Sequence, residues 1–116
     1  MKANTIDVSI IVPVYNVAHY IEDCLRSVMR QTYKGSMECL VVDDCGTDDS
    51  MSIVERMIAE YDGPIQFKIL RHEHNRGLSA ARNTGTMQAT GDYSIKIELN
   101  GSLLSVVKYV INTPYS

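Results

Sequence analysis

Apolar and polar residues alternate along the chain in blocks that predict strands and helices in turn. Residues 8–14 (VSIIVPV) form a nearly continuous apolar, β-branched run, which is typical of a strand covered on both faces. Residues 37–42 (MECLVV) and 65–70 (IQFKIL) predict two further strands, and residues 93–99 predict a fourth. We place residues 8–14 at the centre of the sheet, between 37–42 and the fourth strand.

Three segments between these strands predict helices, at residues 18–31, 50–61 and 79–90. Their apolar residues recur at spacings of three and four. The first helix would bury Tyr20, Ile21, Cys24, Leu25 and Val28, and the second Ile53, Val54, Met57 and Ile58. We expect Asn16 to cap the first helix, and Thr47, Asp48 and Asp49 to supply caps for the second.

This order of elements predicts an α/β fold with a doubly wound, mostly parallel sheet, in a single domain over residues 1–116. Sheets of this kind bind ligands at the carboxyl ends of their strands. Residues 14–16, 43–44 and 98–100 all fall at that edge. We therefore expect a ligand site at that edge.

Composition narrows the classes of function. A formal charge of -3 leaves no basic surface for nucleic acid. Residues 1–7 are too polar for a signal peptide, and no apolar run approaches the roughly 18 residues of a membrane span. The three cysteines have no spacing that suits zinc or a redox motif, so we expect reduced thiols and a cytoplasmic location. His72 and His74 fall in a polar loop, where we expect them to be solvated.

Four blocks carry a resemblance to a known family. They are VSIIVPVYN at 8–16, VVDDCGTDDS at 41–50, NRGLSAARNTG at 75–85 and ATGDY at 89–93. In this order and spacing they resemble family 2 glycosyltransferases, which have the GT-A fold. The resemblance covers residues 8–93, which is most of the chain.

The resemblance implies a domain that binds a nucleotide diphosphate sugar, in particular a UDP-sugar, for inverting transfer of the sugar to a hydroxyl acceptor. It makes Pro13, Val14, Tyr15 and Asp44 the nucleobase site, with Asp44 accepting uracil N3–H. An ionised carboxylate only accepts hydrogen bonds, so it favours a base edge that offers N–H. Arg82 would bind the diphosphate bidentately, with help from backbone N–H groups.

Structural roles remain open for the same residues. Asp43 and Asp44 could cap a turn or a helix, and Arg82 could pair with an acid such as Asp44. Tyr15 could be a strand-end tyrosine with a packed ring. Gly77 and Gly85 fit a turn and a close approach of helix to sheet, and they form no GxGxxG fingerprint.

After residue 93 the sequence departs from the family, whose Asp-x-Asp element holds the ribose and a divalent metal, Mg or Mn. In register, this chain has Glu98 and Asn100 instead. One carboxylate and one neutral amide are a poor ligand set for a hard dication, so we expect weak metal binding. Apolar positions 95, 97 and 99 alternate with Ser94, Lys96 and Glu98, which predicts one solvated strand face.

Asn100-Gly101 then predicts a hairpin turn, and residues 103–111 fit either its return strand or a short helix. We find no counterpart of the family's acceptor-binding half or its general base, so we expect a truncated and catalytically incomplete domain. The alternative is a non-catalytic binding or assembly module. In that case a sheet edge or the apolar tail would pair with another chain, including a second copy.

Overall fold

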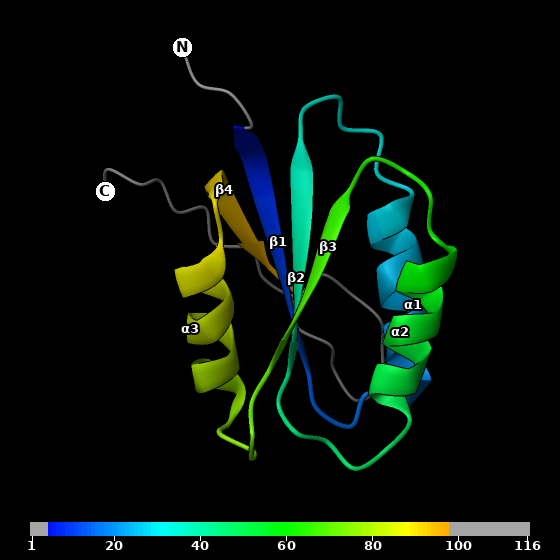
Figure 1. The fold of residues 1–116 in the computed structure, drawn as a ribbon, viewed down its shortest axis with the longest axis vertical. Coiled ribbons are helices and arrows are strands. Elements are labelled where there is room, and N and C mark those ends of the chain that lie inside the picture. The colour runs from blue at the N-terminus through cyan, green and yellow to red at the C-terminus, as the bar shows by residue number, and fades with distance from the viewer. Residues whose placement is uncertain (1–4, 98–116) are drawn as a thin grey trace.

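The structure, a computed structural model, describes residues 5–97 (Figure 1). Its elements in chain order are β1 (Ile6–Val14), α1 (Ala18–Met29), β2 (Met37–Asp43), α2 (Ser50–Glu60), β3 (Gln66–Arg71), α3 (Leu78–Gln88) and β4 (Gly91–Lys96). These are the elements that the apolar pattern predicts, with ends that shift by one or two residues except at the end of β4. The predicted hairpin at Asn100-Gly101 and its return segment at 103–111 lie outside the described residues.

The four strands form one sheet in the order β3-β2-β1-β4, and every pairing is parallel. This confirms the α/β fold and the central place of β1 between β2 and β4. Helices α1 and α2 cover one face of the sheet, and α3 covers the other (Figure 1). Because all four strands run the same way, their carboxyl ends meet at one edge.

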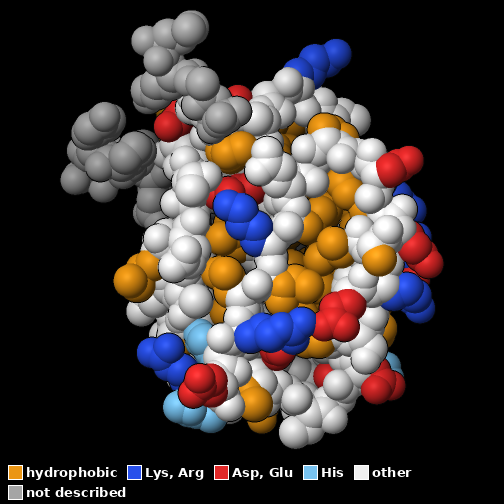
Figure 2. All heavy atoms as spheres, viewed as in Figure 1, with side chains coloured by type: hydrophobic (Ala, Val, Ile, Leu, Met, Phe, Trp, Pro, Cys, Tyr) orange, Lys and Arg blue, Asp and Glu red, His pale blue; other side chains and the backbone are white. Residues whose placement is uncertain are grey.

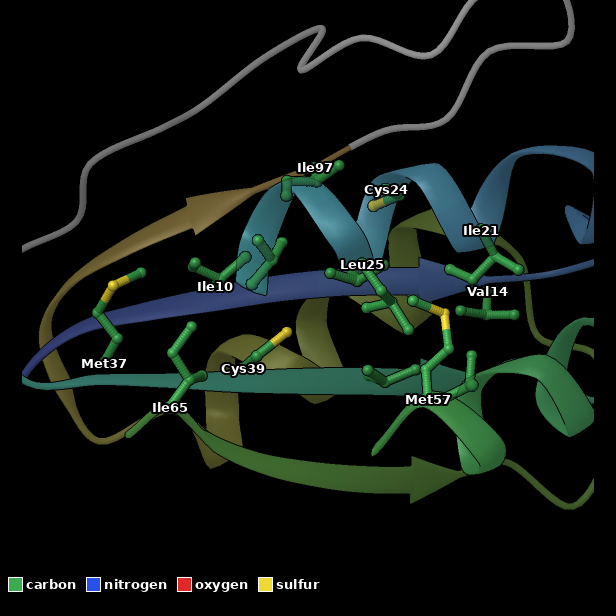
Figure 3. Close-up of a cluster of buried hydrophobic side chains, with 14 residues drawn as sticks. Ile10, Val14, Ile21, Cys24, Leu25, Met37, Cys39, Met57, Ile65 and Ile97 are labelled. Atoms are coloured by element: carbon green, nitrogen blue, oxygen red, sulfur yellow. The ribbon is translucent and has the colours of Figure 1, made fainter. Parts of the chain in front are cut away.

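Alternate residues of β1 enter two separate apolar clusters. Ile10, Val12 and Val14 pack with residues of α1 and α2, including the buried Leu25 and Val54 (Figure 3). Ile11 faces the other way and packs with Leu40, Val42 and Ala81 of α3. Side chains alternate between the two faces of a strand, so a strand between two helical layers must be apolar at nearly every position.

Helix α3 lies very close to the sheet. A β-carbon built on Gly85 would sit 2.5 Å from the Cγ2 atom of Ile11, which is closer than side-chain carbons approach. This confirms the expected role of Gly85. The close approach also explains why the buried side of α3 carries small residues such as Ala81.

The predicted solvated face of β4 is wrong at Ser94, which is only 5% exposed. Ser94 pairs in register with Ser9 of β1, and both belong to the face on which Glu38 of β2 is buried. A serine in this strand therefore marks a buried polar cluster and not contact with water. Lys96 is half-buried.

Edge strand β3 leaves apolar side chains uncovered. Figure 2 shows such side chains along the side of the molecule on which β3 runs, with charged groups around them. Phe67 and Ile69 of β3 are only partly buried against the core, as are Ile53 and Tyr61. Tyr61 and Phe67 meet edge to face, with ring centroids 5.1 Å apart.

Candidate functional site

A cavity of about 380 Å³ opens at the carboxyl ends of the strands. Its described lining consists of Pro13, Val14, Tyr15, Val17, Asp44, Asn75, Gly77, Leu78, Ala81 and Ile97. Four of the five residues that the family resemblance makes candidates for nucleotide binding therefore lie around one space. The fifth, Arg82, is half-buried one turn into α3 and lies outside this lining.

The end of β1 forms one wall of the cavity. Pro13 and Val14 are buried as the last residues of the strand, whereas Tyr15 is 48% exposed. Asn16 follows with a φ of 53°, a left-handed conformation that asparagine tolerates better than most residues. This turn lets the chain leave the sheet immediately after Tyr15 and enter α1.

Asp44, directly after β2, is buried and uses both carboxylate oxygens. Its Oδ1 atom accepts the backbone N–H of Arg76 at 2.8 Å and lies 2.7 Å from Nδ1 of His72. Its Oδ2 atom accepts the side-chain amide of Asn75 at 2.8 Å and the backbone N–H of Gly77 at 2.9 Å. Asp44 thus anchors residues 72–77 to the end of β2, which is one of the capping roles that the sequence leaves open.

The same contacts set the charge of Asp44. Burial by itself would raise the pKa of this carboxyl group, but the hydrogen bonds from His72 and from the N–H groups of Arg76 and Gly77 outweigh burial. The net result is a pKa below the ordinary aspartate value. Asp44 is therefore an ionised acceptor at neutral pH.

The prediction that His72 is solvated is wrong, because this side chain is buried between two elements. Its Nδ1 atom faces Asp44, and its Nε2 atom lies 2.8 Å from Oγ1 of Thr84 in α3. The loop after β3 packs against Asp44 and buries His72. The polar residues that surround His72 in the sequence do not indicate this burial. His74 is exposed, as expected.

Asp43 points to a different set of partners. Its Oδ1 atom accepts the N–H of Cys45 at 3.0 Å, and its Oδ2 atom pairs with Arg71 at 3.1 Å. Arg71 also pairs with Glu55 of α2. Asp43 therefore caps the turn after β2 and connects it to β3, as the structural alternative for this residue predicts.

The expectation that Asn16 caps α1 is also wrong. The residue at the N-cap position is Val17, which supplies no side-chain cap. The Oδ1 atom of Asn16 instead accepts the N–H groups of Thr47 and Asp48, in the loop before α2. Asn16 meets these groups because the loop after β1 and the loop after β2 lie close together in space, and the local sequence does not show this.

Sequence reasoning missed Asn75 and the backbone of Gly77 as parts of the site. Both line the cavity and both donate to Asp44. Asn75 opens the block NRGLSAARNTG, so its position in that block was the available signal. Gly77 has a φ of 96°, which confirms the expected turn and explains why glycine stands there.

Metal-ligand candidates are few in the part of the chain that the structure describes. Residues 5–97 contain no group of three or more His, Cys, Asp or Glu side chains placed to hold a metal ion. Glu98 and Asn100 lie outside the described residues. Within the same range, no helix reaches the length and apolar character that crossing a membrane requires.

The chain is similar in sequence to known glycosyltransferases. The model of glycosyl transferase family 2 matches residues 9–97. Glycosyltransferase GlyA of Streptococcus pneumoniae is 44% identical over 86 residues, which cover 74% of this chain and 12% of that protein.

Two solved structures are similar in fold and sequence. TarS of Staphylococcus aureus (residues 1–349), in complex with UDP-GlcNAc, is 34% identical with a TM-score of 0.71, over 79% of this chain and 26% of that chain. The mannosyltransferase PcManGT of Pyrobaculum calidifontis, in complex with GDP-Man and Mn2+, is 32% identical with a TM-score of 0.72, over 82% and 28%.

These relatives are several times longer than this chain, which spans 12% to 28% of their length. The family match covers residues 9–97, which contain α1, α2 and α3, most of the sheet and the described lining of the cavity. On this match, which covers well over half of its residues, the chain belongs to glycosyl transferase family 2.

Proposed function

We propose that this chain carries the nucleotide-binding part of a transferase that moves a sugar from a UDP-sugar to a hydroxyl acceptor with inversion. The observation that carries the proposal is the arrangement of Pro13, Val14, Tyr15 and Asp44 around one cavity at the carboxyl edge of the sheet. TarS has been solved with UDP and with UDP-GlcNAc, which supports a uridine nucleotide. PcManGT, in complex with GDP-Man, makes a guanine nucleotide the comparison to test.

Asp44 can receive a nucleobase only if one of its present contacts changes. An ionised carboxylate has about four acceptor sites, and protein groups already occupy two on each oxygen. The side-chain amide of Asn75 is the partner that yields, because Asn75 is exposed and its amide can rotate. Backbone N–H groups of Arg76 and Gly77 have no such freedom. Uracil N3–H would then take the place of this amide on Oδ2.

The diphosphate would lie beside α3. Gly77 and Leu78, at the start of this helix, line the cavity, and Arg82 follows one turn later. A guanidinium group and helix N–H groups both suit phosphate oxygens. This assignment of Arg82 rests on the family resemblance and on its place in α3.

A divalent metal fits this chain poorly. PcManGT contains Mn2+, so metal use occurs in the family. By the register of the family resemblance, the corresponding positions of this chain carry Glu98 and Asn100, and a neutral amide is a weak ligand for Mg or Mn. We therefore propose that these 116 residues bind nucleotide and do not turn over by themselves. A cytoplasmic location is part of the proposal and is supported by the free thiols of Cys24, Cys39 and Cys45.

Calorimetric titration of the full chain with UDP, and with GDP for comparison, tests the nucleotide site. We expect UDP to bind and Tyr15→Ala to weaken it about fivefold, because the exposed ring walls the cavity. Tyr33→Ala is the matched control, since Tyr33 is 52% exposed and contacts Asp7 at the other end of the sheet. If neither UDP nor GDP binds, the proposal of a nucleotide site is overturned.

A second titration tests the metal position. Asn100→Asp should strengthen Mn-dependent UDP binding if residues 98–100 approach the cavity, because it restores a carboxylate. Sugar transfer by the unmodified chain would contradict catalytic incompleteness.

One observation favours the alternative, an assembly module. Strand β3 lies at the edge of the sheet, and its side chains Phe67 and Ile69 are only partly buried. An exposed edge strand with apolar side chains can pair with another chain. Thermal unfolding distinguishes the two functions. A nucleotide-binding domain is stabilised by UDP, by an amount that grows with the logarithm of one plus the ratio of the UDP concentration to Kd. A module that only assembles instead melts at a temperature that rises with protein concentration.

A further inference from the structure

We propose that the loops after β1 and β2 form a reciprocal clamp, made by Asn16 on one side and by Asp48 and Ser50 on the other. The clamp holds the end of β1 in the position from which Tyr15 and Val17 line the cavity. These three residues are positioning residues, since they lie outside the described lining of that cavity. The inference rests on the proposed function in one respect, namely that the cavity binds a nucleotide.

The first half of the clamp runs from the β1 loop to the β2 loop. The Oδ1 atom of Asn16 accepts the N–H of Thr47 at 2.7 Å and the N–H of Asp48 at 3.3 Å. These N–H groups precede α2 (Ser50–Glu60), where Asp49 supplies no side-chain cap. Asn16 therefore supplies, from a distant loop, the acceptor for these two N–H groups.

The second half runs in the opposite direction. The Oδ2 atom of Asp48 accepts the N–H of Ala18 at 3.0 Å, and Oγ of Ser50 accepts the N–H of Val17 at 2.8 Å. Asp48 Oδ1 in turn accepts both the hydroxyl and the N–H of Ser50, at 2.6 and 2.9 Å. The first N–H groups of a helix have no partner within the helix, so residues of the β2 loop satisfy the start of α1.

Backbone geometry shows how closely the two loops meet. A β-carbon on Gly46 would lie 2.7 Å from Oδ1 of Asn16 and 3.1 Å from its backbone nitrogen. Asn16 and Cys45 both have left-handed φ angles, of 53° and 60°, which residues other than glycine adopt rarely. Such conformations persist where surrounding contacts hold them. The clamp holds Asn16 through its side chain, whereas the N–H of Cys45 donates to Oδ1 of Asp43 at 3.0 Å.

The clamp also has an electrostatic component. Burial would raise the pKa of Asp48, but hydrogen bonds from Ser50 and Ala18 lower it overall. Asp48 is therefore ionised at neutral pH. An ionised carboxylate accepts on both oxygens, as the clamp requires, whereas an asparagine amide would turn one accepting atom into a donor.

Two variants break the clamp and two matched variants leave it intact. Asp48→Asn and Ser50→Ala remove acceptors. Asp49→Asn changes the neighbouring aspartate, which makes no cap, and Ser52→Ala changes an exposed serine of α2. Hydrogen exchange of the full chain should become at least tenfold faster at the amides of Val17 and Ala18 in the first pair. Because the clamp is reciprocal, the amide of Thr47 should also exchange faster.

Nucleotide affinity tests whether the clamp positions the site. We expect Asp48→Asn and Ser50→Ala to bind UDP about five- to tenfold more weakly, which corresponds to one lost hydrogen bond. Val28→Ala is the control for lost stability, since it opens the core near the far end of α1. It should lower the melting temperature and leave UDP affinity unchanged while the protein is folded.

The outcomes separate the inference from the proposed function. Faster exchange in both loops with weaker UDP binding supports the clamp. Unchanged exchange at Thr47 in Ser50→Ala overturns its reciprocity, and faster exchange with unchanged UDP affinity overturns its positioning role. If the unmodified chain binds no nucleotide, the proposed function and the positioning role both fail, while the exchange rates still decide whether the loops are coupled.

Discussion

Glu38 and Asp44 lie near opposite ends of β2, and each holds a distant loop against the sheet through hydrogen bonds to its carboxylate. Each is a buried carboxylate that binds backbone N–H groups of a distant loop. Asp44 anchors residues 72–77 at the carboxyl edge of the sheet. Glu38 accepts the hydroxyl of Ser9 and the N–H of Thr90, both at 2.6 Å, and so anchors the connection from α3 to β4 at the other edge.

The two carboxylates differ in what surrounds them. Glu38 pairs with Nζ of the half-exposed Lys68 side chain at 3.2 Å and lies outside the described lining of the cavity. Asp44 lines the cavity, beside Asn75. A buried acid that holds a loop is therefore no sign of a ligand site by itself. Its place at the carboxyl end of a parallel strand, next to an open space, is what distinguishes Asp44.

The largest effect should come from Asp44→Ala, which breaks both roles at once. It leaves the buried His72 and three part-buried donors of the 72–77 loop without an acceptor, so we expect the free energy of unfolding to fall by about 3 kcal/mol. UDP affinity should fall at least tenfold, because the loop that carries Asn75 and Gly77 loses its anchor. Urea unfolding and calorimetry measure the two effects, and an unchanged affinity would remove Asp44 from the site.

Glu38→Ala should separate stability from binding. We expect a loss of about 2–3 kcal/mol in the free energy of unfolding, because Ser9, Thr90 and Lys68 lose a common acceptor. UDP affinity of the folded variant should stay within about twofold of the unmodified chain, since one lost hydrogen bond at the site would cost more than this. A larger loss of affinity would show that the two ends of the sheet are coupled.

Lowering the pH should reduce the stabilisation that Glu38 and Asp44 give to the folded protein. Burial raises the pKa of Glu38, but hydrogen bonds from Ser9, Thr90 and Lys68 outweigh it, so its pKa, like that of Asp44, lies below the ordinary value. The unfolded chain therefore binds more protons, and the stabilisation present above the ordinary values of 4.5 and 3.8 is lost as the pH falls through the folded values.

The measurement for this pH prediction is urea unfolding between about pH 6 and pH 3. Glu38→Gln and Asp44→Asn should each show a shallower decline than the unmodified chain. Asp49→Asn, which changes an exposed acid, should follow the unmodified curve. If all four proteins decline alike, neither buried carboxylate carries the pH dependence.

The smallest effect should come from Lys68→Met. The Lys68 side chain is 45% exposed, so its attraction to Glu38 is screened by water, and we expect a loss of about 1 kcal/mol or less in the free energy of unfolding. Ser9 and Thr90 would still hold the carboxylate. A loss as large as that of Glu38→Ala, measured by the same urea titration, would mean that the ion pair outweighs the hydrogen bonds.

Much of this fold could be predicted because its signals are local. The strands and helices follow from apolar spacing, and Gly77 and Gly85 mark a turn and a close contact that the structure confirms. The failures share one cause. His72, Asn16 and Ser94 looked solvated or locally capping, yet each has its partners in another part of the chain.

Two weak signals were present in the sequence. Ser9 and Glu38 are polar residues inside otherwise apolar strand runs, where an unpaired polar group would be costly. Their register in adjacent parallel strands brings them together. A polar residue at such a position thus predicts a buried partner, but it does not say which one.

The sequence by itself determined the layered α/β fold, the central place of β1 and the acids that follow β2, because burial on two faces and strand polarity are written in residue spacing. Only the tertiary structure decided which donors meet those acids. Asp44 and Asn75 are 31 positions apart, and Glu38 and Thr90 are 52 apart. Hydrogen bonds form over a few ångströms and depend on where loops return after crossing the sheet, so no local pattern can specify them.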